Sequence, residues 1–404
     1  MDHFPFEPIS SMIKSEITCP EFTSRFQVQS ILGSGAFSSV FCVKQRSNGS
    51  IVAIKILKQR STTTTTTIIT NECSNANDSS NNNKCDKSHK SASFKNMVRK
   101  EIDIHTLISS YNHPHIVKVL ESFEYNTNDI SSASKLVHAI VLEYCELGTL
   151  QQYLKRVRDD TICGKTGQNR FTFLPEEEVR FALRQLFRAL SMIHAHAIVH
   201  RDIKPENILL AASNSKAFVD RQRFSLMDCV LKLSDFGLAV KMKDDDDWNN
   251  GQNGLCGTLA TMAPEVFMTG KQTRSRSKLG IVDKYQSVVG YGQPADLWST
   301  GVIQYLMLVG RFPFISSKPS KPESFQKDKE RFHIIKNAMK EVVEGKLVLP
   351  SNILISQSGN YLLHQLLNKN PQHRGFARGK RIHLCMFHFH TGSLSNVFQS
   401  LLFE

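Results

Sequence analysis

The hydrophobic pattern changes about a third of the way along the chain, and this change limits the folds that the chain can adopt. Before Gly148, short apolar runs bounded by turn residues predict strands, with one helix among them. After Gly148, helical spacing predominates. The strands are predicted at residues 26–32, 38–44, 51–57, 116–124 and 136–142, and the helices at 94–108, 149–157, 175–194, 294–309 and 332–344. This order favours an α+β fold with a small, β-rich first lobe and a larger, mainly helical second lobe.

Composition and charge narrow the class of protein. A chain of 404 residues, of which 40% are hydrophobic, can bury a sizeable core. The formal net charge of +13 is compatible with acidic partners. No zinc-finger, RNP or basic-zipper signature is present, so nucleic acid is not an expected partner. The 9 cysteines form no C-x-x-C pair, which indicates free thiols in a reducing compartment.

Two features bear on where the protein resides. No stretch reaches the roughly 18 apolar residues that a membrane span needs. The first residues include early acids and lack a long apolar run, so they form a poor secretory signal. We therefore expect an intracellular protein without a membrane span, in the cytoplasm or the nucleus.

Residues 59–93 differ in composition from the segments on either side. They contain an uninterrupted run of threonines at 62–67 and a Ser/Asn run at 79–83, and they offer no apolar face that could pack. We interpret them as a disordered insertion. Shorter loop-like insertions are predicted at residues 159–173, 211–228, 271–290 and 316–329.

Two features of the first lobe could serve a phosphorylated ligand. Gly33 and Gly35 lie at a strand-to-strand turn, where backbone N–H groups can approach phosphates closely, although most such turns are only turns. Lys55 lies inside an apolar strand, where an unpaired charge would be costly. Lys55 therefore either extends to solvent from an edge strand or pairs with an acid, and Glu101 on the next predicted helix is the candidate partner.

The run of residues 200–207 carries the most specific chemistry. It places a carboxylate, an ammonium group and an amide on one loop, at Asp202, Lys204 and Asn207. Phosphoryl transfer requires a group that accepts the hydroxyl proton, a cation for the transferred phosphoryl group and a metal ligand. Further along, a predicted strand ends at Asp235, whose carboxylate is a suitable magnesium ligand.

The order of these segments is itself informative. They are the glycine-rich turn, Lys55, Glu101, His-Arg-Asp at 200–202, Asp-Phe-Gly at 235–237, Ala-Pro-Glu at 263–265, the run at 296–301 and Arg374. By this series, from Phe26 to Arg374, the chain resembles eukaryotic protein kinases. The Lys-Pro-Glu-Asn run at 204–207 resembles the serine/threonine type. Other segments resemble calcium/calmodulin-dependent kinases, with polo-like and Aurora-like features.

The resemblance implies a two-lobed protein kinase fold and a division of the chain. We expect an N-terminal tail at residues 1–25, a kinase domain at 26–374 and a divergent segment at 375–404. Within the domain we expect an N-lobe at 26–142 that carries the insertion at 59–93, a hinge at 143–148 and a C-lobe at 149–374. The implied enzyme transfers the γ-phosphate of ATP to serine or threonine hydroxyls of protein substrates, with Mg²⁺ as cofactor and as a monomer.

Catalytic roles carry over by this resemblance. Asp202 would orient the substrate hydroxyl and accept its proton, and Lys204 would neutralise the γ-phosphate. Thr258 would bond both of these side chains. Lys55 would hold the α- and β-phosphates and pair with Glu101. Two further pairs are implied to brace the site: Asp296 with the catalytic loop, and Glu265 with Arg374.

The resemblance also implies how ATP and Mg²⁺ are held. Asn207 and Asp235 would bind the metal. The glycine-rich turn would cover the phosphates, apolar side chains would enclose the adenine, and the hinge backbone would bond its edge. The residues implied for the nucleotide are Leu32, Gly33, Gly35, Val40, Ala53, Lys55, Glu143, Cys145, Leu209 and Asp235.

Two alternatives remain beside this prediction. A kinase-shaped scaffold without catalysis is suggested by the insertions and by residues 375–404, which show no clean helical stripe where kinases add a closing helix. The intact set of catalytic residues argues against it. A zinc site is suggested by His383, Cys385, His388 and His390, although their spacing fits no closed structural site. The histidines at 194, 196 and 200 are interpreted as the end of a helix and the start of the catalytic loop.

Two departures from the resembled pattern concern regulation and substrate contact. Position 254, where relatives carry a phosphorylated threonine, is Gly254, and four aspartates at 244–247 precede it. These aspartates form either a solvated turn or a substitute for the phosphate that pairs with Arg201. Thr261 stands where most relatives have tyrosine, which predicts an altered substrate-facing loop.

Overall fold

The computed structural model describes residues 17–35, 38–57, 85–127, 135–162, 172–213, 224–242, 258–268, 292–314 and 328–374. The chain divides into two compact units. The first unit holds Met1–Thr67, Glu72–Leu147 and Ser234–Gly237, and the second holds Ile68–Asn71, Gly148–Leu233 and Leu238–Glu404. The boundary after Leu147 falls in the predicted hinge. The short segment Ser234–Gly237 belongs to the first unit, although the sequence analysis assigned it to the second lobe.

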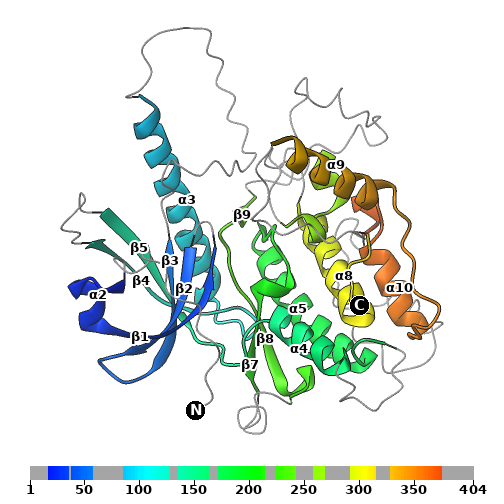
Figure 1. Ribbon diagram of the computed structural model, residues 1–404, viewed down its shortest axis with the longest axis horizontal. Helices are drawn as coiled ribbons and strands as arrows, with labels where there is room; N and C mark the ends of the chain where they lie inside the picture. Colours follow the sequence, from blue (N-terminus) through cyan, green and yellow to red (C-terminus); the bar gives the residue numbers. More distant parts are fainter. Residues whose placement is uncertain are drawn as a thin grey trace, which may run out of the picture. The chain divides into compact units, whose positions relative to one another are not determined.

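A five-stranded antiparallel sheet with the order β1-β2-β3-β5-β4 forms the first unit (Figure 1). A tight turn closes the β2–β3 hairpin at Gly49, whose φ of 73° favours glycine. Because β3 is the central strand, Lys55 does not extend from a sheet edge, and that interpretation was wrong. The strands are β1 (Phe26–Ser34), β2 (Ser38–Gln45), β3 (Ile51–Leu57), β4 (Val119–Thr127) and β5 (Lys135–Glu143).

Two elements of the first unit differ from the sequence-based prediction. Part of the expected tail forms a short helix, α2 (Pro20–Arg25), and packs on the sheet. Phe22 is fully buried there, with its ring 5.4 Å from that of Phe26. The single long helix, α3 (Cys85–Ser110), begins earlier than residue 94. Residues 85–93 are therefore helical, and the prediction that they are disordered was wrong. The rest of the expected insertion, residues 59–84, lies outside the described residues.

Helices dominate the second unit (Figure 1). The α5 helix begins with three acids in its first turn, which suit the positive end of the helix, and its apolar stripe is buried. Nearly every residue of α8 is buried, so this helix lies within the core of the unit. The helices are α4 (Leu150–Ile162), α5 (Glu176–Ala195), α7 (Pro264–Met268), α8 (Gln293–Val309), α9 (Asp328–Glu344) and α10 (Gln357–Leu366). Of these, α7 and α10 were not predicted.

Short strands and 3₁₀ turns of the second unit carry the functional loops. Strand β6 (Ile198–Val199) pairs with β9 (Val240–Lys241), and β7 (Ile208–Ala212) pairs with β8 (Cys229–Leu233). The 3₁₀ turns are η1 (Pro205–Asn207), η2 (Leu226–Asp228), η4 (Leu259–Thr261) and η7 (Pro371–His373). These elements place residues 200–207 between β6 and β7. Across the described ranges, no helix is both long and apolar enough to cross a bilayer.

Candidate active site

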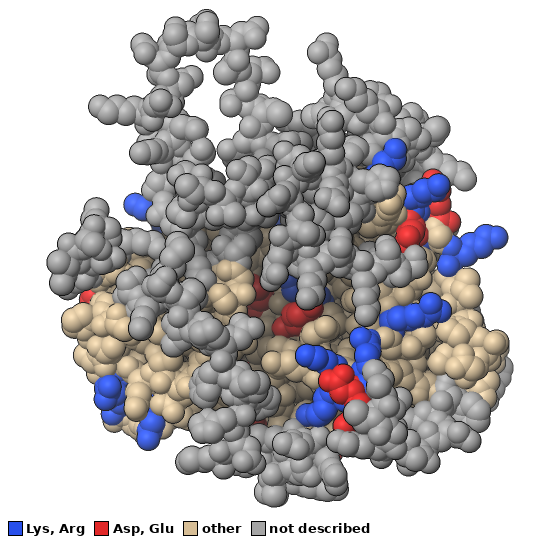
Figure 2. Space-filling model, viewed as in Figure 1, with Lys and Arg blue, Asp and Glu red and all other residues tan. Residues whose placement is uncertain are grey.

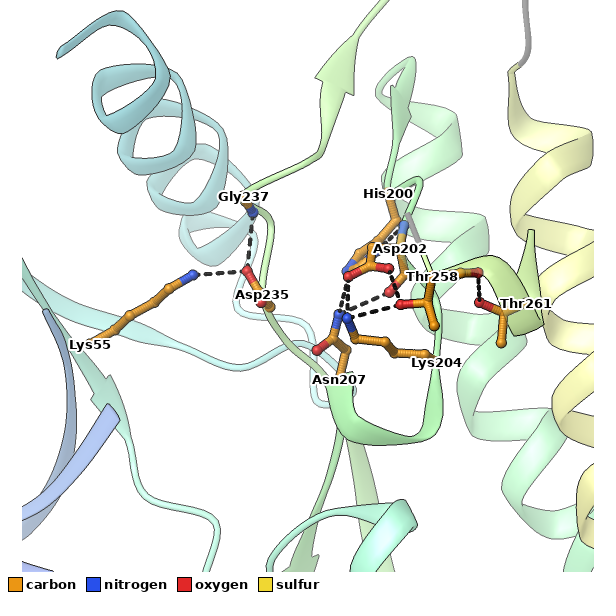
Figure 3. Close-up of polar contacts among 9 residues, drawn as sticks. All are labelled: Lys55, His200, Asp202, Lys204, Asn207, Asp235, Gly237, Thr258 and Thr261. Atoms are coloured by element: carbon orange, nitrogen blue, oxygen red, sulfur yellow. Dashed lines mark hydrogen bonds and ion pairs between the residues drawn. The ribbon is translucent and has the colours of Figure 1, made fainter. Parts of the chain in front are cut away.

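Lys55 is the centre of a buried ion cluster in the first unit. Its Nζ lies 2.5 Å from Oε1 of Glu101 on α3, so the predicted partner is confirmed by the geometry. The same Nζ lies 2.8 Å from Oδ1 of Asp235 (Figure 3). Lys55 and Glu101 are only 7% and 5% exposed, whereas the Asp235 side chain is 43% exposed. The cluster is therefore closed on the side of Glu101 and open at Asp235.

The charges of this cluster are set by burial and by one another. Burial would lower the pKa of the Lys55 ammonium, but the carboxylates of Asp235 and Glu101 outweigh it and raise that pKa above its ordinary value. Burial raises the pKa of the Glu101 carboxyl, and the charge of Asp235 adds to the rise while Lys55 opposes it. Lys55 consequently remains a cation at any physiological pH.

Asp235 is held in a strained conformation. Its φ of 62° is in the left-handed region, which is unfavourable for a residue with a Cβ. The N–H of Gly237 donates to Oδ1 of Asp235 at 3.3 Å, and the ring of Phe236, which is fully buried, packs 4.7 Å from that of His105 on α3. Strain of this kind at an exposed carboxylate supports a ligand-binding role for Asp235.

A second polar cluster, in the second unit, surrounds Asp202 (Figure 3). Lys204 Nζ donates to Oδ2 of Asp202 at 2.6 Å, and Thr258 Oγ1 donates to Oδ1 at 3.1 Å. Lys204 Nζ also donates to Thr258 Oγ1 at 3.2 Å. Asn207 Nδ2 donates to the Asp202 carbonyl at 2.9 Å and to Oδ2 at 3.1 Å. The four predicted catalytic residues of this unit are thus brought together, with a hydroxyl, a cation and an amide that all donate to the carboxylate of Asp202.

The loop that carries Asp202 is fixed from α8. Asp296, only 1% exposed, accepts the backbone N–H groups of His200 and Arg201, each at 2.9 Å, and bonds Nε2 of His194 at 2.8 Å. Burial would raise the pKa of the Asp296 carboxyl, but the bond and charge of His194 and the contacts of His200 outweigh it, so the pKa is lowered. Asp296 is therefore an anion that holds the loop, including Arg201 at its strained φ of 69°.

The predicted pair of Glu265 and Arg374 is also present. Two parallel bonds of 2.6 Å join the carboxylate to the guanidinium. The two side chains are 4% and 0% exposed, so the pair is fully enclosed in the second unit. Its remaining donors are used by carbonyl groups of the chain. This arrangement is structural, because no part of it faces solvent.

The residues implied for ATP lie in both units. Gly35 N–H donates to the Ser38 carbonyl at 2.8 Å and closes the glycine-rich turn, of which Ala36 and Phe37 lie outside the described residues. The N–H of Glu143 donates to the Lys118 carbonyl at 3.0 Å, so this N–H is already bonded within the first unit. The first unit holds Leu32, Gly33, Gly35, Val40, Ala53, Lys55, Glu143, Cys145 and Asp235, whereas Leu209 on β7 belongs to the second.

Metal-binding alternatives find no support among the described residues, where no group of three or more His, Cys, Asp or Glu side chains could hold a metal ion. His194 bonds Asp296, and Nδ1 of His196 bonds the Met192 carbonyl at 2.8 Å. The cluster of His383, Cys385, His388 and His390 lies outside the described residues, as do Gly254 and the aspartates at 244–247.

The basic side chains of the described residues form no single patch on the face drawn in Figure 2. There, these Lys and Arg side chains are scattered, and several lie beside acids.

Sequence reasoning missed the contacts that support Thr258. Thr261 was noted only as a departure, yet its hydroxyl bonds the Thr258 carbonyl. Ser299 on α8 in turn bonds the Thr261 carbonyl. A signal was available, because Ser299 follows Asp296 by three residues and so lies on the same face of a helix.

Comparisons with known proteins agree with this geometry. A model of the protein kinase domain matches residues 82–379, which begins after Lys55. The serine/threonine-protein kinase PLK4 of Aedes aegypti is 28% identical over 86% of this chain and 32% of its own length. That of Xenopus laevis is 26% identical over 86% and 26%, and serine/threonine-protein kinase 33 of Bos taurus is 29% identical over 72% and 46%. The chain thus spans about a third of the length of its PLK4 relatives. With a match over most of its length and the pairs of the site in place, the chain belongs to the protein kinase domain family.

Proposed function

We propose that this protein transfers the γ-phosphate of ATP to serine or threonine hydroxyls of protein substrates. The observation that carries the proposal is the cluster in which Asp202 is bonded by Lys204, Asn207 and Thr258. A substrate hydroxyl that bonds Asp202 would lose its proton to this carboxylate as the phosphoryl group is transferred. Lys204 lies beside it and would neutralise charge on the transferred group.

Lys55 and Asp235 supply the charges that a nucleotide with its metal requires. Lys55 is a permanent cation that two carboxylates orient, which suits the α- and β-phosphates. The carboxylate of Asp235 and the amide oxygen of Asn207 are the hard oxygen ligands that Mg²⁺ prefers. Magnesium, when bound, would neutralise phosphate charge, and these two residues would hold it.

The choice of serine or threonine as acceptor is proposed from two side chains. Lys204 and Thr258 bond one another and Asp202, so both stand beside the acceptor site. The similar proteins named above are serine/threonine-protein kinases. Protein substrates are proposed as partners, and a monomer as the active form.

Asp202→Asn tests the proposal. Proton acceptance by a positioned side chain contributes roughly 10²- to 10⁴-fold, so transfer of ³²P from ATP to a generic protein substrate should fall by about that factor. Asp103→Asn is the matched control, because its side chain is 69% exposed on α3, and it should keep full transfer. Equal transfer by the wild type and Asp202→Asn would overturn the catalytic role.

The same proteins separate catalysis from binding alone. Ligand at about 100 times its Kd should stabilise the wild type by roughly 2.7 kcal/mol, which a thermal-shift assay with ATP and Mg²⁺ detects. A shift without transfer would favour the kinase-shaped scaffold. Asp235→Ala should lose the magnesium-dependent part of the shift, and an equal shift in this variant would contradict the proposed metal ligand.

A further inference from the structure

Thr258 is placed by a 3₁₀ turn whose bonds involve the side chain of Thr261. Thr258 is the N-cap of η4, and its carbonyl accepts two bonds from Thr261. The N–H of Thr261 donates at 3.0 Å, as in any such turn. The hydroxyl of Thr261 donates at 3.2 Å, which is specific to this side chain (Figure 3). Removal of the hydroxyl would leave the turn with one bond at this carbonyl.

The turn is also tied to the core of its unit. Thr261 is only 2% exposed, and its own carbonyl accepts the Ser299 hydroxyl at 2.8 Å. Ser299 is 9% exposed, and its hydroxyl also lies 3.1 Å from the Ala295 carbonyl within α8. Thr261 therefore links Thr258 on one side to α8 on the other.

One turn of α8 thereby reaches both partners of a catalytic bond. Asp296 fixes the loop of Asp202 through the N–H groups of residues 200 and 201. Ser299, three residues later on the same helical face, fixes the turn of Thr258 through Thr261. The bond of 3.1 Å between Thr258 Oγ1 and Asp202 Oδ1 therefore joins two segments that are both hydrogen-bonded to side chains of α8.

We propose that Thr261 is a positioning residue, which with Ser299 sets the Thr258 hydroxyl against Asp202 and so fixes the carboxylate for transfer. The inference rests on the proposed function. Thr258 Oγ1 has a single proton, which it gives to Asp202 while it accepts from Lys204. A small displacement of the turn would break this arrangement and leave Asp202 with one restraint fewer.

Thr261→Val and Thr261→Ser test the proposal as a pair. Valine keeps the shape and loses the hydroxyl, whereas serine keeps the hydroxyl and loses the methyl group. A hydrogen bond contributes about fivefold to tenfold when its net value is near 1 kcal/mol. We expect kcat for a peptide substrate to fall about fivefold to tenfold in Thr261→Val, with the KM for ATP unchanged, and to recover in Thr261→Ser.

Tyr305→Phe is the matched control. It also removes one hydroxyl bond to a carbonyl from a buried side chain, that of Tyr305 to Val348 at 2.8 Å, and Tyr305 lies on the same helix α8. It should lower the Tm as Thr261→Val does while kcat stays at the wild-type value. Ser299→Ala should lower kcat, and the double variant with Thr261→Val should lower it by less than the product of the two effects.

The outcomes separate this inference from the proposed function. An inactive wild type would overturn the proposed function. An active wild type with full kcat in Thr261→Val, and only a loss of Tm as in Tyr305→Phe, would overturn the positioning role alone. A loss of kcat in Thr261→Ser equal to that in Thr261→Val would show that the hydroxyl does not by itself position Thr258 and would also overturn it.

Discussion

Two lysines, the buried Lys55 in the first unit and the partly buried Lys369 in the second, are held by opposite surroundings. Lys55 lies between the carboxylates of Glu101 and Asp235, at 2.5 and 2.8 Å. Lys369, between α10 and η7, donates to the Val342 carbonyl and lies over two aromatic rings, 3.6 Å from the centroid of Phe314 and 5.0 Å from that of Trp298. No carboxylate within the described part of the chain is paired with it.

The pKa values of these lysines differ accordingly. The carboxylates outweigh burial at Lys55, and its pKa is raised. Burial lowers the pKa of Lys369 to about 8, and the positive charge of Arg374 adds to the fall. The aromatic faces act in the opposite direction, because they favour the cation. The acids therefore fix the charge of Lys55, as its proposed role at the phosphates requires, whereas Lys369 packs against a carbonyl and two rings.

The largest expected effect, on the free energy of unfolding, comes from replacing Arg374, the charged neighbour of Lys369. Arg374→Met leaves the enclosed carboxylate of Glu265 without a partner. Loss of one member of a buried pair costs about 3–5 kcal/mol, so the free energy of unfolding from urea titration should fall by that amount. Combining it with Glu265→Leu should restore most of the loss, because an apolar pair needs no counter-charge.

An exposed pair serves as the control for that experiment. Arg99 and Asp103 lie four residues apart on α3, and Nε of Arg99 is 3.8 Å from Oδ2 of Asp103. Their side chains are 84% and 69% exposed. Arg99→Met should change the free energy of unfolding by less than about 0.5 kcal/mol. An equally small effect of Arg374→Met would show that the pair with Glu265 does not hold the second unit together.

The next effect concerns the charge of Lys55. Lys55→Met removes the cation proposed to bind phosphate, so transfer to a protein substrate should fall about 10²- to 10³-fold. Glu101, whose pKa burial already raises, can take up a proton in this variant, which limits the loss of stability. Lys369→Met should leave kcat unchanged. Equal losses of activity in the two variants would remove the distinction between the lysines.

The strand and the partner of Lys55 could be predicted from the sequence, whereas the contacts of Lys369 could not. Strand β3 was predicted at its observed limits, Ile51–Leu57, because a short run rich in β-branched residues that only Lys55 interrupts, and that follows an Asn-Gly turn, admits few other structures. The pair of Lys55 and Glu101 followed from a buried charge that needs a partner. The surroundings of Lys369 come from residues far apart in sequence, Phe314 and Val342, and no local pattern joins them.

The elements that sequence reasoning missed share a physical cause. Helix α2 has only six residues, too few for a periodic stripe, and its place depends on the packing of Phe22. The start of α3 at Cys85 is polar, so helical periodicity could not reveal it. At the site, the motif identified Asp202 and Thr258, but the bonds of Thr261 and Ser299 depend on how η4 meets α8.

A further expected effect is a pH dependence between pH 8 and pH 10.5 that Lys369 should show and Lys55, whose pKa is raised, should not. The pKa of this lysine is about 8 in the folded protein and 10.5 ordinarily, so between these values the unfolded chain binds more protons. Stability rises with pH wherever the unfolded state binds more protons, and Lys369 should therefore favour folding progressively from pH 8 to pH 10.5. The measurement is the difference in free energy of unfolding between the wild type and Lys369→Met at several pH values in this range, in which groups common to both proteins cancel. The difference should shift in favour of the wild type as the pH rises. A shift in the opposite direction would mean that the faces of Phe314 and Trp298 hold Lys369 as a cation, and that the two lysines differ in their partners but not in their charge.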